Sequence, residues 1–339
     1  MNSSREGRDE QSSAPRLGQG PQEERAALAA AALGVAGSRS AGASGRKTDT
    51  LFDEAFMAKL EYLEIVSRKT FQALNRGERR SKKLGAGLEF ADHRRYSPGD
   101  DFRNIDWNVY ARLGKLLLRL YEEEEDLFVY LLVDGSASMA LGDRAKLDHA
   151  SRIAAALAYV TLAGLDRASL ASFSEKLGQR LLPARGKSQI FRVFDFLRGI
   201  APGGVTSFRE SMRAFVHETK RRGLVVVMSD FYAQDGYEEG LNYLRYHRFE
   251  PVVLQMVDER ELSPALRGDV LLVDCETGRH KEMTLTPRLL EKYRQAHEAF
   301  SGELETFCTA SHIPYYRAPV QTPVDELVLG ILRSGGMLS

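Results

Sequence analysis

Two uninterrupted apolar runs, each followed at once by small polar residues and an aspartate, constrain the fold of this chain most strongly. Residues 127–133 read Leu-Phe-Val-Tyr-Leu-Leu-Val, and residues 224–228 read Leu-Val-Val-Val-Met. Runs without polar alternation are typical of strands buried on both faces of a sheet, and such strands belong to parallel sheets covered by helices. The sequence therefore predicts an α/β protein with these two strands at its centre.

Helical periodicity separates the predicted strands. After the first run, apolar residues recur every three or four positions from Leu147 to Val160, which predicts an amphipathic helix. Further helices are expected over 190–200, 208–221, 237–247, 288–310 and 325–333, with strands over 168–173, 179–182 and 251–257 and near 315, and a hairpin over 268–286. Strands that alternate with helices form right-handed crossovers. We therefore expect a doubly wound, mostly parallel, Rossmann-type sheet with helices on both faces.

The residues before the first apolar run divide into three parts. Residues 1–50 contain no Phe, Trp, Tyr or Ile, so this segment cannot bury enough apolar surface to fold and is predicted to be a disordered tail. Residues 51–74 have the periodicity of an amphipathic helix, and 85–125 are expected to be strands joined by turns. The predicted domains are the tail 1–50, a helix with a β-rich region at 51–126, the α/β domain at 127–333, and a C-terminal tail at 334–339.

Composition excludes several classes of protein. Lys and Arg total 47, as do Asp and Glu, and a balanced charge argues against a nucleic-acid binder. No apolar run approaches the roughly 18 residues of a membrane span, so we expect no integral membrane segment and a cytoplasmic protein. The two cysteines, Cys275 and Cys308, are too few for a disulfide scaffold or a zinc site built from cysteines.

Polar side chains follow the two central strands at the point where each ends. Asp134, Ser136 and Ser138 come after the first strand, Asp230 follows the second, and Thr206 lies in a Gly-rich loop before a helix. Ligands bind at the carboxyl ends of strands in such sheets, and hard oxygen donors suit Mg²⁺ or another divalent cation. The alternative is purely structural, because Asp, Ser and Thr also cap turns and helices.

These residues resemble the metal-ion-dependent adhesion site of a von Willebrand factor A domain. The run from Asp134 to Met139, followed by Thr206 and then Asp230, matches that site in order and spacing. The resemblance implies that the three hydroxyl groups bind the ion directly and that the two carboxylates act mainly through water. It also implies that the sixth ligand is an acidic residue of a protein partner.

A second block resembles the signature of the bacterial DUF58 family. It comprises residues 87–90, the segment 95–107 (Arg-Tyr-Ser-Pro-Gly-Asp-Asp-Phe-Arg-Asn-Ile-Asp-Trp) and residues 111–112. The resemblance implies a MoxR-type AAA+ ATPase, or a client that such an ATPase remodels, as partner. Many longer relatives have N-terminal membrane helices, and this chain is similar to the short soluble form.

The charged residues of this second block have two interpretations. We favour an ion-pair network around Trp107 that fixes local geometry. A docking surface for a partner is the alternative. The predicted members of the network are Arg95, Asp100, Arg103, Asp106 and Arg112.

Sequence patterns for enzymes are weak. Residues 185–188 lack the glycine of a phosphate-binding loop at Leu181, and His149, close to Ser136 in sequence, is expected to face solvent on its helix. The sequence therefore favours a non-enzymatic interaction module that binds an acidic residue of a partner through Mg²⁺. A metal-dependent hydrolase using the same ion, or a structural scaffold with a vestigial metal site, remains the alternative.

Overall fold

The computed structural model describes residues 51–74, 84–85, 89–122, 127–141, 143–262, 268–276 and 278–333. The two predicted tails, 1–50 and 334–339, lie outside these residues. A central six-stranded sheet has the order β11-β8-β7-β4-β5-β6. Its strands are β4 (Phe128–Asp134), β5 (Arg167–Phe173), β6 (Leu177–Arg185), β7 (Leu224–Ser229), β8 (Glu250–Val257) and β11 (Tyr315–Pro319).

Every strand pair in this sheet is parallel except that of the edge strand β6, which runs antiparallel to β5. The two apolar runs become β4 and β7, which pair with each other at the centre of the sheet. Both strands are almost entirely buried, as expected for parallel strands with helices on both faces. The predicted α/β fold with a mostly parallel, Rossmann-type sheet is confirmed.

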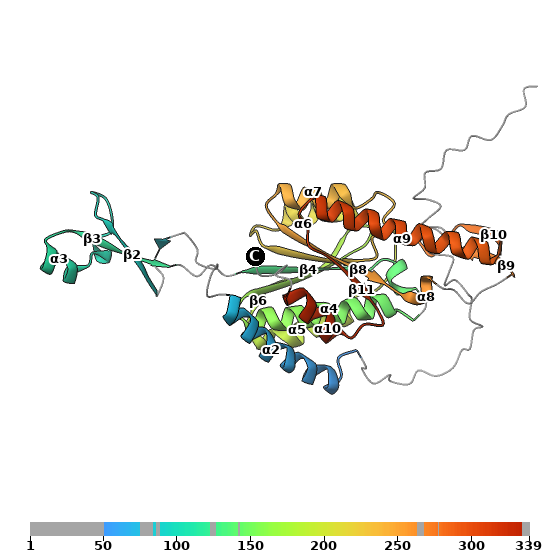
Figure 1. The fold of residues 1–339 in the computed structure, drawn as a ribbon, viewed down its shortest axis with the longest axis horizontal. Helices are drawn as coiled ribbons and strands as arrows, with labels where there is room; N and C mark the ends of the chain where they lie inside the picture. The colour runs from blue at the N-terminus through green and yellow to red at the C-terminus, as the bar shows by residue number, and fades with distance from the viewer. Residues whose placement is uncertain are drawn as a thin grey trace, which may run out of the picture.

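Helices cover both faces of the sheet (Figure 1). On one face lie α2 (Glu54–Leu74), α4 (Ala145–Ala163), α5 (Ile190–Arg198) and α10 (Val324–Arg333). On the other lie α6 (Phe208–Glu218), α7 (Glu238–Tyr246) and α9 (Pro287–Ala310), while the short α8 (Glu259–Leu262) follows β8. Side chains alternate along β4, so that Val129 and Leu131 pack into the first layer whereas Tyr130 and Leu132 pack into the second.

The helix α2 belongs to the core of the α/β unit. Phe52, just before α2, stacks on Phe194 of α5 with ring centroids 4.4 Å apart. Glu64 of α2 accepts hydrogen bonds from Lys187 at 2.5 Å and from Tyr159 of α4 at 3.2 Å. The predicted division grouped this helix with the β-rich region, but its contacts place it in one of the two helical layers.

A small second sheet has the order β1-β3-β2, with β1 (Leu84–Gly85), β2 (Glu89–Arg95) and β3 (Leu117–Glu122). The same region also contains a helix, α3 (Trp107–Leu113), which the expectation of strands and turns missed. The Asp106 carboxylate caps this helix by accepting hydrogen bonds from the backbone N–H groups of Asn108 and Val109. Gly114 ends the helix in the left-handed conformation.

The predicted ion-pair network of this region exists, but it is centred on Asp106 instead of Trp107. The Asp106 carboxylate lies 2.9 Å from the Arg119 guanidinium and 3.0 Å from His93 Nε2. Asp100 pairs with Arg94, which is not among the predicted members, at 2.7 Å. The side chain of Trp107 is 58% exposed, so it does not organise the network.

No described helix combines the length and the apolar character that a membrane crossing requires.

Close packing between α6 and α7 gives a testable prediction. A Cβ atom on Gly240 would lie 2.5 Å from the Phe208 ring and 3.2 Å from Met212. Gly240→Ala should therefore lower the free energy of unfolding by about 1–3 kcal/mol through overpacking. The matched control is Gly302→Ala in α9, where an added Cβ meets nothing within 4 Å. That change should stabilise the protein by about 0.5–1 kcal/mol because alanine favours helix. Urea unfolding of both variants checks the opposite signs, and equal effects would contradict this account.

Candidate metal centre

The carboxyl ends of β4 and β7 are joined by a buried hydrogen-bond network. Asp134, the last residue of β4, accepts a hydrogen bond from the Ser136 backbone N–H at 2.9 Å through one oxygen. Its other oxygen accepts a hydrogen bond from the Ser229 hydroxyl of β7 at 2.5 Å. All three residues are completely buried. Both oxygens of Asp134 therefore hold the loop after β4 against the end of β7.

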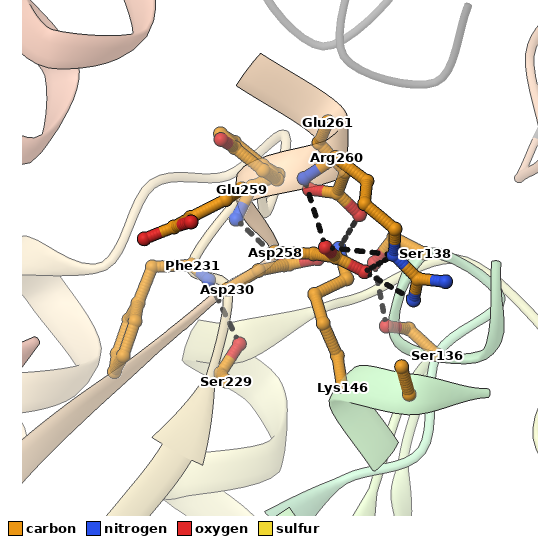
Figure 2. Close-up of polar contacts among 12 residues, drawn as sticks. Ser136, Ser138, Lys146, Ser229, Asp230, Phe231, Asp258, Glu259, Arg260 and Glu261 are labelled. Carbon is orange, nitrogen blue, oxygen red and sulfur yellow. Dashed lines mark hydrogen bonds and ion pairs between the residues drawn. The ribbon is translucent and has the colours of Figure 1, made fainter. Parts of the chain in front are cut away.

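Two hydroxyl groups lie together on this loop. The Oγ atoms of Ser136 and Ser138 are hydrogen-bonded at 2.9 Å, and Figure 2 shows both side chains beside the Lys146 and Asp230 side chains. Two oxygens on adjacent vertices of an octahedral Mg²⁺ site, with bonds of about 2.1 Å, are about 3.0 Å apart. The separation of the two hydroxyl oxygens therefore fits two ligands of one ion.

The Gly-rich loop at 202–207 brings Thr206 to the same edge of the sheet. The Gly203 N–H donates to the Gly135 carbonyl at 2.8 Å, and the Ala137 N–H donates to the Gly204 carbonyl at 3.2 Å. Gly204 has a φ of 80°, which L side chains rarely adopt, so glycine is required at this contact. The two loops are thus paired through their backbones, with Thr206 buried beside them.

The alternative that Thr206 and Ser207 serve only to cap helix α6 does not explain the hydroxyl group of either residue. Ser207 occupies the N-cap of α6 without a side-chain capping bond. Asp235 provides the cap instead, by accepting hydrogen bonds from the backbone N–H groups of Phe208 at 3.2 Å and Arg209 at 3.0 Å. The Thr206 side chain is therefore not needed to begin this helix.

Asp230 is held by a buried cation that sequence reasoning missed. The Lys146 ammonium of α4 lies 2.9 Å from Asp230 Oδ2 and 2.7 Å from Glu261 Oε1 of α8, as Figure 2 shows. The side chains of all three residues are at most 4% exposed. The next residue, Phe231, has a φ of 63°, an unusual conformation for a bulky residue that is typical of functional loops. Lys146 thus fixes the direction of the Asp230 carboxylate.

Glu276 lies in the turn between residues 273 and 280 and was not singled out from sequence. Burial, together with the negative charges of Asp230 and Asp134, raises the pKa of Glu276 to about 7. Burial and the charge of Asp230 likewise raise the pKa of Asp134 to about 7. The Lys146 ammonium contacts two buried carboxylates, those of Asp230 and Glu261, so one positive charge faces two acidic groups.

The residues present fit a divalent cation. The predicted ligands Ser136, Ser138 and Thr206 offer neutral oxygens, while Asp134 and Asp230 offer negative charge at the same edge of the sheet. Across the described residues, no three His, Cys, Asp or Glu side chains gather as a metal-binding group, so a site here would depend on the hydroxyls. The excess negative charge is what a divalent ion would neutralise.

Two histidines lie buried near this edge, which corrects the expectation for His149. His149 of α4 is only 7% exposed, and its Nε2 atom has no hydrogen-bond partner. His297 of α9 is 5% exposed with an unpartnered Nδ1 atom. Burial lowers the pKa of each to about 4. Both imidazoles are therefore neutral at physiological pH.

From the low pKa values of these two histidines we expect the free energy of unfolding to fall in acid. Because the folded pKa of about 4 lies below the ordinary value of 6.5, the unfolded chain binds protons more tightly. Above pH 6.5 neither state protonates these histidines and the free energy of unfolding is at its full value. As the pH falls toward 4, protons bind to the unfolded chain first, and the free energy of unfolding falls by about 3 kcal/mol for each histidine. His149→Phe should flatten this dependence in urea unfolding measured from pH 7 to 4. His280→Phe on the surface should leave it unchanged, and equal slopes for the wild type and both variants would contradict the assignment.

The buried ion pair predicts a large destabilisation by substitution of Lys146. Lys146→Met removes the ammonium and leaves Asp230 and Glu261 buried without a counter-ion. The free energy of unfolding in metal-free buffer should fall by about 3–5 kcal/mol. Lys59→Met, which breaks a half-exposed pair with Asp325, is the control and should cost less than about 1 kcal/mol. A Lys146 variant as stable as the Lys59 variant would show that the ammonium is dispensable.

Comparisons with known proteins place the chain in a family. It is 29% identical over 260 residues to the uncharacterized protein Mb1516 of Mycobacterium bovis, covering 74% of this chain and 81% of the relative. The uncharacterized protein Rv1480 of Mycobacterium tuberculosis matches with the same identity and coverage. Among solved structures, the conserved hypothetical protein BatB from Bacteroides thetaiotaomicron matches with a TM-score of 0.40 and 14% identity, covering 63% of this chain and all of that one.

The family model DUF58, described as a protein of unknown function, matches residues 92–301. This match begins within β2 of the small sheet and covers most of the α/β unit, including every residue of the candidate metal centre. The chain therefore belongs to the DUF58 family.

Proposed function

We propose that this protein is a metal-dependent protein-interaction module, whose α/β unit is a von Willebrand factor A-like domain. The observation that carries the proposal is the pair of Ser136 and Ser138 hydroxyls, 2.9 Å apart beside buried carboxylates. The order of strand-end motifs along the chain, which resembles the adhesion site of such domains, supports the same assignment.

Each residue of the centre has a separate task in this proposal. Ser136, Ser138 and Thr206 hold Mg²⁺, or another divalent ion, through neutral oxygens. Asp134 and Asp230 act through water, because each already accepts hydrogen bonds from protein groups. When bound, the ion supplies a concentrated positive charge that attracts the carboxylate of a partner. Neutral donors preserve that attraction because they cancel none of the ion's charge.

The proposed module is not an enzyme. Hydrolysis by a bound metal requires a general base that can take a proton from water. Both oxygens of Asp134 are engaged with Ser136 and Ser229, which suits a role in holding the loop. We infer instead that the site works by binding, in the cytoplasm, with a MoxR-type AAA+ ATPase or its client as the partner. The family resemblance supports this partner.

A second candidate function is a metal-independent scaffold, and one observation favours it. The Lys146 ammonium already neutralises part of the charge of Asp230 at 2.9 Å. In a vestigial site this ammonium would take the place of the metal. The paired hydroxyls of Ser136 and Ser138 support the metal-dependent function over this one.

Metal titration tests the proposal. Isothermal titration of the purified chain with Mg²⁺ should show one binding site, and Ser138→Ala should weaken the affinity at least about tenfold by removing one direct ligand. Ser188→Ala, at an exposed position away from the sheet edge, is the control and should bind like the wild type. No heat of binding for the wild type with either Mg²⁺ or Mn²⁺ would favour the metal-independent scaffold.

Capture of the MoxR-type ATPase on the immobilised protein, compared with and without EDTA, tests the second half of the proposal. Binding should require the metal and should be lost in the Ser138 variant. Capture that survives both treatments would show that the partner binds elsewhere.

A further inference from the structure

The strand β11 forms one edge of the central sheet, and its outer side has no neighbouring strand among the described residues. It pairs with β8 in an uninterrupted parallel register from Tyr315 to Pro319. The opposite edge strand, β6, differs because two register shifts interrupt its pairing with β5. Irregularities of this kind protect a sheet edge from further pairing. The register of β11 offers no such protection.

The backbone of β11 directs polar groups away from β8. Along a parallel strand, successive residues turn their N–H and C=O groups to alternate sides. The Pro314 carbonyl accepts a hydrogen bond from the Val253 N–H of β8 at 2.9 Å. Just after the strand, the Val320 N–H donates to β8 at 2.9 Å as well. Even-numbered positions therefore bond β8, and the odd-numbered Tyr315 and Arg317 turn their N–H and C=O groups outward.

A proline limits the length of this free edge. Pro319, at the end of β11, has no N–H group, and its carbonyl accepts a hydrogen bond from the Thr322 N–H at 3.0 Å. The outward donors and acceptors that remain are those of Tyr315 and Arg317. An added strand of about three to five residues would reach all of them.

A groove of about 430 Å³ lies along this edge, between α9 and α10. The two helices cover opposite faces of the sheet (Figure 1), so β11 forms the floor of this β11 groove. Each wall contains a glycine, Gly302 in α9 and Gly330 in α10. A Cβ atom on either glycine would meet nothing within 4 Å. The two small residues therefore keep the groove open.

Negative charge predominates in the β11 groove. Glu298 of α9 is paired with Arg317 through two contacts of 3.1 Å. Glu305 of α9 and Glu326 of α10 also line the groove and are exposed. Within the described part of the chain, neither of these two glutamates forms an ion pair. Three carboxylates and one guanidinium line the groove, so it attracts a positively charged ligand.

The two faces of an added strand would meet different walls. Side chains alternate along β11, since Tyr315 packs on the side of α9 whereas Tyr316 packs on the side of α10. An added strand continues this alternation. Its side chains on the α9 side meet Glu298 and Glu305, and those on the α10 side meet Leu327, with one glutamate beside it. The walls therefore favour a segment in which basic and apolar residues alternate.

We propose that the β11 groove is a second binding site of this protein, which takes up an extended segment of a partner protein as an added strand. The segment carries alternating basic and apolar residues. Hydrogen bonds to the backbone of Tyr315 and Arg317 provide affinity, and the two walls provide specificity. The site goes beyond the proposed metal-dependent function, since it uses none of the residues of the candidate metal centre.

Selection of peptides from a phage-displayed library of random heptapeptides, with the full chain immobilised, tests the proposal. The selected peptides should be enriched in Lys and Arg at alternate positions and depleted in Asp, Glu and Pro. Selected peptides without a basic preference would overturn the proposal, and so would a selection that enriches no peptide.

Binding of the consensus peptide, followed by fluorescence anisotropy, locates the site. Gly330→Leu fills the β11 groove and should weaken binding at least about tenfold. Leucine favours helix more than glycine does, so the variant keeps its fold. Ala299→Leu, at an exposed position of α9 outside the groove, is the matched control and should bind like the wild type. Unchanged binding by Gly330→Leu would overturn the proposal.

Charge gives the next measurement. The double variant Glu305→Gln with Glu326→Gln should weaken peptide binding about threefold to tenfold. The control removes the same charge at exposed positions elsewhere, by Glu61→Gln in α2 and Glu282→Gln in β10 (His280–Leu285), which pairs with β9 (Gly268–Val273). This control should bind like the wild type. Equal weakening by both double variants would show attraction by general charge and would overturn the specific site.

Backbone methylation of the peptide separates strand addition from a contact made by side chains alone. Two versions of the consensus peptide, each methylated on every second amide, lose N–H groups on opposite edges of the strand. One version should bind at least about tenfold more weakly and the other should bind like the unmodified peptide, because only one edge meets β11. Equal binding by the two versions would overturn the added strand.

The outcomes are separable from those for the metal centre. EDTA and Ser138→Ala should leave peptide binding unchanged. Peptide binding that requires the metal would overturn the second site. A wild type that binds the peptide but no divalent ion would support the β11 groove and overturn the proposed function instead.

Discussion

The buried ammonium of Lys146 is the interaction on which the rest of the site depends. It joins α4, the loop after β7 and the short helix α8, by contacts to Asp230 and Glu261 at 2.9 and 2.7 Å. A buried ion pair contributes little net stability, yet it strongly disfavours any arrangement that separates the two charges. Lys146 therefore determines where the ends of these three elements lie. The loop after β4, which carries Ser136 and Ser138, lies beside them.

One ammonium cannot balance the carboxylates that converge here. The chain as a whole has equal numbers of positive and negative residues, so its net charge favours neither anionic nor cationic ligands. The imbalance is local and buried, where screening by salt is weak and each unpaired charge acts strongly. A site that selects a small cation can thus form in a protein with no net charge, because selection depends on the few residues at the strand ends.

The sequence predicts the parts of this structure that depend on periodicity. The continuous apolar runs predicted β4 and β7. The rule that ligands bind at the carboxyl ends of strands predicted that Asp134 and Asp230 lie at one edge of the sheet. Lys146 was missed because its contacts join residues far apart in the chain. One signal for Lys146 was available: it lies four positions before Ala150, on the apolar stripe of its helix, where a lysine needs a buried partner. The helix α3 was missed although Asp106 is a good N-cap, because turn residues dominate its surroundings.

The segment between β8 and α9 contributes the carboxylate of Glu261 to this edge. Glu261 is paired at 2.7 Å with an ammonium that is itself fully buried, so its removal would leave an uncompensated charge. It is anchored further by its neighbour Arg260, which bonds Asp258 and also Asp143 in the loop before α4. The ion pairs of Lys146 therefore hold α4, the loop after β7 and α8 together at the end of the sheet.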